Sequence, residues 1–123
     1  MHRPMHFELS VDDVEKALPF FTNVFGWKIE KWDGPINYWM VTTGDENETG
    51  IDGAIMLKEN EFPPTVLVVD VDDIDPVLEK VKQNGGEIIL PKNPIPSVGY
   101  AAYFKDPQGV VMGVFQTDRS ASF

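Results

Sequence analysis

The chain matches itself at an offset of 60 residues, and this internal repeat constrains the fold more than any other feature of the sequence. The clearest match aligns Val11-Asp12-Asp13-Val14 with Val71-Asp72-Asp73-Ile74. Further matches pair Leu18 with Leu78, Gly26 with Gly86, Ile29 with Ile89 and Gly53 with Gly113. A chain of 123 residues therefore holds two modules, about 4–58 and 64–117, and neither alone is long enough to bury a sufficient core. We expect a single domain in which the two modules share one core.

Each module predicts a strand, a helix and three more strands. In the first, residues 5–11 alternate between apolar and polar side chains, and a helix begins at Asp12 or Asp13 and ends at Gly26. In the second, residues 65–71 form the strand and residues 72–84 the helix. The remaining strands are expected at 27–31, 36–43, 51–57, 87–90, 100–104 and 110–116, with a linker at 59–64 and a frayed tail at 119–123. The order βαβββ, repeated once, predicts an α+β fold.

The charge and the residue usage exclude several classes of function. Ten Lys and Arg against twenty Asp and Glu give a net charge of −10, which disfavours binding to nucleic acid or to an anionic membrane. The chain has no cysteine, so disulfides, thiolate nucleophiles and cysteine-bound metals are excluded. The N-terminal residues contain no signal-like apolar run, and we expect a cytoplasmic protein.

The repeat and three local motifs resemble the vicinal oxygen chelate superfamily. These motifs are His6-Phe7-Glu8-Leu9 with Asp12-Asp13, the helix end Val24-Phe25-Gly26-Trp27, and Tyr103-Phe104-Lys105-Asp106-Pro107-Gln108-Gly109 before the last strand. The superfamily includes glyoxalase I, bleomycin-resistance proteins, fosfomycin-resistance proteins and extradiol dioxygenases. The resemblance implies that the tandem βαβββ modules form a curved mixed sheet with a concave pocket. Within the superfamily the chain is most similar to poorly characterised glyoxalase-like proteins.

The resemblance also implies four positions for metal ligands, on the first and last strands of each module. They map onto His6, Gly53, Val66 and Gly113, and only His6 has a donor atom. A divalent metal usually needs at least three protein donors, so we expect no catalytic metal. A divalent metal held with the help of Asp52 or Glu48 is the alternative.

His6 and Glu8 are the candidate catalytic residues. They alternate with Met5, Phe7 and Leu9, so they should lie on the face of the first strand that points away from the helices. A histidine and a carboxylate on one face can act as an acid–base pair or anchor a polar ligand. The structural alternative is a buried histidine whose partner is Glu8.

The same alternation predicts an apolar pocket with one polar corner. We expect Val111 in its wall and space at Gly53 and Gly113, while Trp39 and Tyr100 are further candidates for its mouth. Packing in the core or in a dimer is the alternative for the aromatic residues. The expected ligand-binding residues are His6, Glu8, Tyr38, Met40, Ile55, Val66, Val68, Tyr103 and Phe115.

These features predict a homodimeric protein that binds a small molecule, similar to bleomycin-resistance proteins. The alternative is a lyase or isomerase related to lactoylglutathione lyase, with proton transfer by His6 and Glu8 or with a divalent metal. A third possibility is an assembly partner whose cavity is filled by its own side chains.

Overall fold

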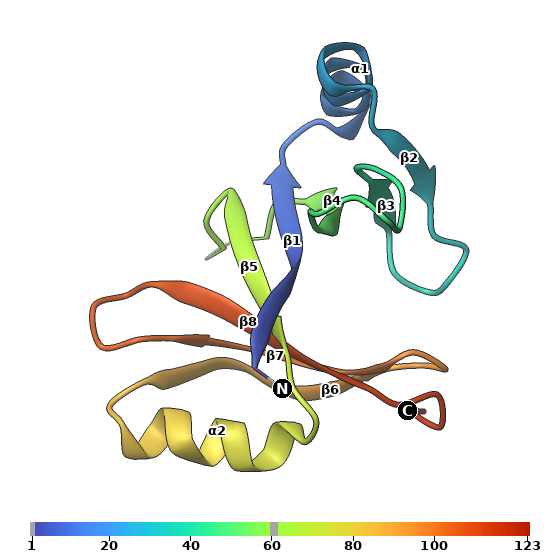
Figure 1. The fold of residues 1–123 in the computed structure, drawn as a ribbon. Coiled ribbons are helices and arrows are strands. Elements are labelled where there is room, and N and C mark those ends of the chain that lie inside the picture. The colour runs from blue at the N-terminus through green and yellow to red at the C-terminus, as the bar shows by residue number, and fades with distance from the viewer. Residues whose placement is uncertain (1, 60–61) are drawn as a thin grey trace. The chain divides into compact units, whose positions relative to one another are not determined.

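The predicted order of helices and strands is confirmed by a computed structural model, which describes residues 2–59 and 62–123 (Figure 1). Residues 60 and 61 of the expected linker lie outside the described residues. The first module comprises β1 (Arg3–Val11), α1 (Val14–Phe25), β2 (Lys28–Lys31), β3 (Tyr38–Thr42) and β4 (Asp52–Leu57). The second comprises β5 (Thr65–Asp70), α2 (Ile74–Gln83), β6 (Glu87–Ile95), β7 (Gly99–Lys105) and β8 (Val111–Thr117). Neither helix of the described chain has the length and apolar character that a membrane crossing requires.

Both helices begin at equivalent aspartates of the repeat. Asp13 caps α1 by accepting a hydrogen bond from the Lys16 backbone N–H at 3.3 Å, and Asp73 caps α2 by accepting one from Asp75. An aspartate at this position pairs a backbone donor that the first helical turn leaves free. Gly26 then ends α1 with a φ of 71°, a conformation that glycine adopts without steric cost.

The chain divides into two compact units. The N-terminal unit is His6–Val66, and the C-terminal unit contains the residues up to Met5 together with Leu67–Phe123. The strand order is β2-β3-β4-β1 in the N-terminal unit and β5-β8-β7-β6 in the C-terminal unit. In each, one parallel pair, β1 with β4 or β5 with β8, adjoins antiparallel pairs. The α+β class and the mixed sheet are therefore confirmed, whereas the concave pocket stays a prediction.

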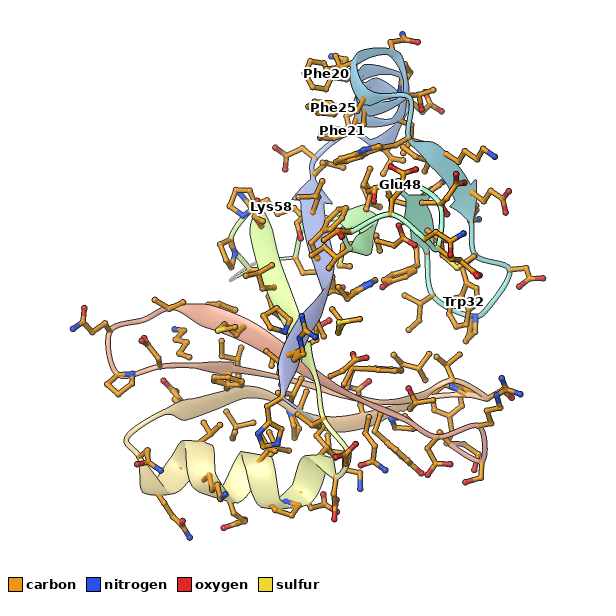
Figure 2. The ribbon with its side chains drawn as sticks, viewed as in Figure 1. Phe20, Phe21, Phe25, Trp32, Glu48 and Lys58 are labelled. Carbon is orange, nitrogen blue, oxygen red and sulfur yellow. The ribbon has the colours of Figure 1, made fainter. Side chains whose placement is uncertain are left out.

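In the N-terminal unit, aromatic rings connect α1 to β1. Trp27 packs against Phe7 of β1 at 5.7 Å between ring centroids, and it stacks on Phe21 at 5.4 Å and on Phe25 at 5.1 Å. Phe20, Phe21 and Phe25 project from the same side of α1 (Figure 2). Residue Phe7 therefore marks the face of β1 on which α1 packs.

In the C-terminal unit, α2 packs on a buried apolar cluster of Val71, Ile74, Ala102 and Val114. The Ile74 side chain is fully buried, and its backbone N–H donates a hydrogen bond of 2.9 Å to the Gln116 side chain. This hydrogen bond ties the first turn of α2 to β8.

The registers of the two modules show where the offset of 60 fails. In β4, Ala54 lies beside Glu8 of β1, whereas in β8 it is Gly113 that lies beside Val68 of β5. The helices repeat after 60 residues, but the last strands repeat after 59, because 113 minus 54 is 59. Gly53 pairs with Phe7 and lies on the face of α1, so its expected place beside the pocket is wrong.

Two segments differ from the sequence-based expectations. Strand β6 continues to Ile95 through Pro91 and Pro94, which are tolerated because β6 is the last strand in the order and has one open edge. The expected frayed tail is partly docked: Ala121 is only 4% exposed, and its carbonyl accepts a hydrogen bond from Ser97. Asp118 stabilises this turn, and hydrogen bonds from Ser120 lower the pKa of its carboxyl.

Candidate functional site

Three polar side chains, His6, Glu8 and Tyr38, form a cluster in the N-terminal unit. The His6 Nε2 atom lies 2.8 Å from the Tyr38 hydroxyl, and the hydroxyl is 3.5 Å from Glu8 Oε2, to which it can donate. The rings of His6 and Tyr38 are nearly parallel, with centroids 6.4 Å apart. Glu8 is only 6% exposed, which is unusual for a carboxylate. We name these three side chains the polar cluster.

The strands place the cluster on the face of the sheet away from Phe7. His6 and Glu8 are two residues apart on β1, so their side chains point the same way. Tyr38 of β3 pairs with Met56 of β4, and Met56 pairs with Ser10 of β1, which gives Tyr38 the same face as His6 and Glu8. His6 and Glu8 thus share one face, as the alternation predicts, and Tyr38 from another strand lies on that face as well.

The Tyr38 hydroxyl has one proton to share between two neighbours. When it donates to Glu8, the hydrogen bond with His6 must be donated by Nε2 of the imidazole. When it donates to His6 instead, Nε2 is unprotonated and accepts. The cluster can therefore exist in two proton arrangements that differ in the His6 tautomer.

Tyr38 stays protonated over a wide range of pH. Burial raises its pKa above the ordinary value, and the charge of Glu8 and the hydrogen bond to that carboxylate raise it further. Each cause disfavours the phenolate. Tyr38 is therefore a hydrogen-bond donor at neutral pH, even beside a histidine.

The raised pKa of Tyr38 predicts a loss of stability at alkaline pH. Because the folded-state pKa lies above the unfolded value of ~10, the contribution of Tyr38 is fully present below pH ~10 and is lost as the pH rises further. Urea unfolding midpoints at pH 8 and pH 11 should fall less steeply in Tyr38→Phe than in the native chain. Tyr100→Phe, which alters a tyrosine of the C-terminal unit, is the matched control, and equal slopes for all three proteins would contradict this prediction.

Other expected site residues of the N-terminal unit divide between the two faces. Met40 pairs with Ala54, which pairs with Glu8, so Met40 shares the face of the polar cluster. Ile55 pairs with Leu9 and Trp39 and is fully buried on the face of Phe7, so its expected place in the pocket is wrong. A shift of one residue in register inverts a side chain, and the true register separates Ile55 from His6.

The expected site residues Val68, Tyr103 and Phe115 share one face with Gly113 in the C-terminal unit. Gly113 pairs with Val68 and Tyr103, and a Cβ at this glycine would lie 2.9 Å from the Tyr103 ring. Phe115 follows on the same face of β8, whereas Val66 is buried on β5 and belongs to the N-terminal unit. Val68, Tyr103 and Phe115 thus form an apolar group in the C-terminal unit.

The residues do not fit the metal site that the fold class implies. Of the four implied positions only His6 has a donor, and Gly53 lies on the opposite face from it. Asp52 pairs with His6 along the strand, but its Oδ1 accepts hydrogen bonds from the backbone and hydroxyl of Thr43. Within residues 2–59 and 62–123, no group of three or more His, Asp or Glu side chains is arranged to hold a metal ion.

The fold and the cluster define a tandem βαβββ protein with a polar site on the first module. A family model of the Glyoxalase/Bleomycin resistance protein/Dioxygenase superfamily matches residues 3–114. The chain therefore belongs to this superfamily.

Similar proteins carry glyoxalase-type names. "Putative glyoxylase CFP32" of Mycobacterium tuberculosis is 30% identical over 122 residues, which cover 94% of this chain and 46% of that protein. The chain thus spans about half the length of this relative. The "Probable lactoylglutathione lyase" of Vibrio cholerae is 25% identical over 131 residues, with 97% of this chain and 94% of that protein covered.

Solved structures show the same fold. A hypothetical protein from Bacillus halodurans C-125 superposes with a TM-score of 0.71 at 16% identity, covering 99% of both chains. Methylmalonyl-CoA epimerase from Mycobacterium tuberculosis superposes with a TM-score of 0.68 at 13% identity, covering 93% of this chain and 87% of that one.

Trp32 is a neighbour of the cluster that the sequence pattern does not indicate. It lies in the loop that leads from β2 to β3 (Figure 2), and its indole meets the Tyr38 ring edge to face at 6.3 Å. The run Trp32-Asp33-Gly34-Pro35 indicates a turn, and nothing in its pattern shows which strand face the indole contacts.

Proposed function

We propose that the N-terminal unit binds a small neutral molecule through a carbonyl or hydroxyl oxygen at the polar cluster, without a resident metal. The observation that carries this proposal is the hydrogen-bonded contact of His6 with Tyr38 beside the buried Glu8 carboxylate. Groups that can both donate and accept hydrogen bonds recognise such an oxygen. The Glu8 carboxylate and the net charge of −10 favour a neutral ligand over an anion.

Hydroxyacetone is a suitable first probe because it carries a carbonyl and a hydroxyl on adjacent carbons. Isothermal titration should give a Kd on the order of millimolar, because so small a ligand makes few contacts. Tyr38→Phe should weaken binding about tenfold, since the cluster loses its hydroxyl. His6→Gln should weaken it as well, and Tyr100→Phe should leave the Kd unchanged. Absent binding, or equal binding by all four proteins, would contradict the proposal.

A second candidate function, proton transfer, is favoured by the chain of acid–base groups in the cluster. The Glu8 carboxylate accepts a proton from the carbon next to the carbonyl, while Tyr38 donates its proton to the carbonyl oxygen and receives one from His6. The enediol that results takes the proton from Glu8 at the former carbonyl carbon. The hydroxyl on the first carbon returns its proton to His6 through Tyr38 and becomes the new carbonyl, which completes an isomerisation. The names of the relatives, glyoxylase and lactoylglutathione lyase, support chemistry of this kind.

Solvent exchange tests the proton transfer without knowledge of the natural substrate. In D2O, the native protein should introduce deuterium at the hydroxyl-bearing carbon of hydroxyacetone, which proton NMR measures. Glu8→Gln should lose this activity. Exchange no faster than in buffer would remove the second candidate and leave the binding proposal standing.

A further inference from the structure

An apolar surface adjoins the polar cluster on the same side of the sheet. It consists of Trp32 and Met40, which we name the apolar shelf. Met40 is 42% exposed, and Trp32 is half-buried against the Tyr38 ring. Exposed apolar groups next to a polar site are typical of ligand-binding surfaces.

Met40 is placed in line with Glu8. The two residues flank Ala54 in one row across β3, β4 and β1. Adjacent strands are ~4.8 Å apart, so the backbones of Met40 and Glu8 are separated by roughly 10 Å. Ala54, which lies between them, is fully buried, so Met40 is the exposed apolar residue of this row.

Trp32 is held in a fixed orientation beside Tyr38. Its backbone N–H donates a hydrogen bond of 2.8 Å to the Tyr38 carbonyl, and its indole meets the Tyr38 ring at 74°. The Gly34 backbone lies against the indole so closely that a Cβ there would overlap the ring. A rigid aromatic side chain binds flat apolar groups at a low cost in conformational entropy.

We propose that the ligand carries a flat apolar group, such as an aryl ring, next to its oxygen, and that the apolar shelf binds this group. The inference rests on the proposed function, because the polar cluster holds the oxygen end. An aryl ketone or an aryl-substituted hydroxyketone fits this description. The ring contacts Met40 and Trp32, while the carbonyl meets Tyr38.

Two probes that differ in one group test the inference. 2-Hydroxyacetophenone carries a phenyl ring where hydroxyacetone carries a methyl group, and the oxygen atoms are the same. The native protein should bind the phenyl compound about tenfold more tightly, measured by isothermal titration. In Trp32→Ala and in Met40→Ala the ratio of the two Kd values should fall to about threefold or less.

Trp39→Phe is the matched control, because Trp39 lies on the same strand as Tyr38 but on the face of Ile55. It should keep the tenfold preference. A native protein without the preference, or a preference that both shelf variants retain, overturns the inference. If hydroxyacetone binds in a Tyr38-dependent manner while the phenyl ring adds nothing, only the apolar shelf is refuted. If neither probe binds, or if binding ignores Tyr38→Phe, the proposed function falls as well.

Discussion

Gly53→Ala should destabilise the N-terminal unit by about 3 kcal/mol. A Cβ at this position would overlap the carbonyl oxygen and the ring of Phe7. The ring could turn, but only by giving up its contact with Trp27, and the carbonyl belongs to β1 itself. The strain therefore falls on the strand that carries His6 and Glu8.

Tryptophan fluorescence during urea unfolding measures this effect directly. The three tryptophans of the chain, Trp27, Trp32 and Trp39, all lie in the N-terminal unit. Gly50→Ala is the matched control, since a Cβ there meets no atom within 4 Å, and its unfolding midpoint should stay close to the native one. Equal midpoints for the two variants would show that Gly53 is not packed as described.

Ile74→Ala should lower the free energy of unfolding of the C-terminal unit by about 3 kcal/mol. Ile74 is fully buried and belongs to the cluster that joins α2 to the sheet. Truncation removes buried apolar surface and leaves a cavity, while the backbone hydrogen bond to Gln116 remains possible.

Far-UV circular dichroism during urea unfolding provides the measurement for this second variant. Val110→Ala is its control, because Val110 is 54% exposed and its truncation should cost well under 1 kcal/mol. A loss for Ile74→Ala no larger than that for Val110→Ala would contradict the packing of α2 described above.

Much of the fold could be predicted because the repeat and the capping residues act locally. Asp13 and Asp73 begin the two helices one repeat apart, and Gly26 ends the first of them. Strand alternation alone also placed His6 and Glu8 on one face. Such signals lie within a few residues and need no knowledge of the partner strand.

The predictions that were wrong or missing depend on how strands and loops pair in the fold. The place of Ile55 depended on the register of β4 against β1, which the offset of 60 misses by one residue. The contact of Trp32 with Tyr38 depends on how a loop returns to its strand. Strand β6 is predicted to end before Pro91, because proline usually interrupts a strand. It continues to Ile95 because it has an open edge, and an open edge cannot be recognised from the sequence alone.

Imidazole ¹⁵N NMR tests most directly whether the polar cluster binds a ligand. The chain has two histidines, and His2 is an internal control because it is exposed and outside the cluster. During titration with hydroxyacetone, the Nε2 resonance of His6 should shift and saturate at the Kd found by calorimetry, while the resonances of His2 stay in place. A His6 resonance that does not move, or one that moves only as much as that of His2, would contradict binding at His6, Tyr38 and Glu8.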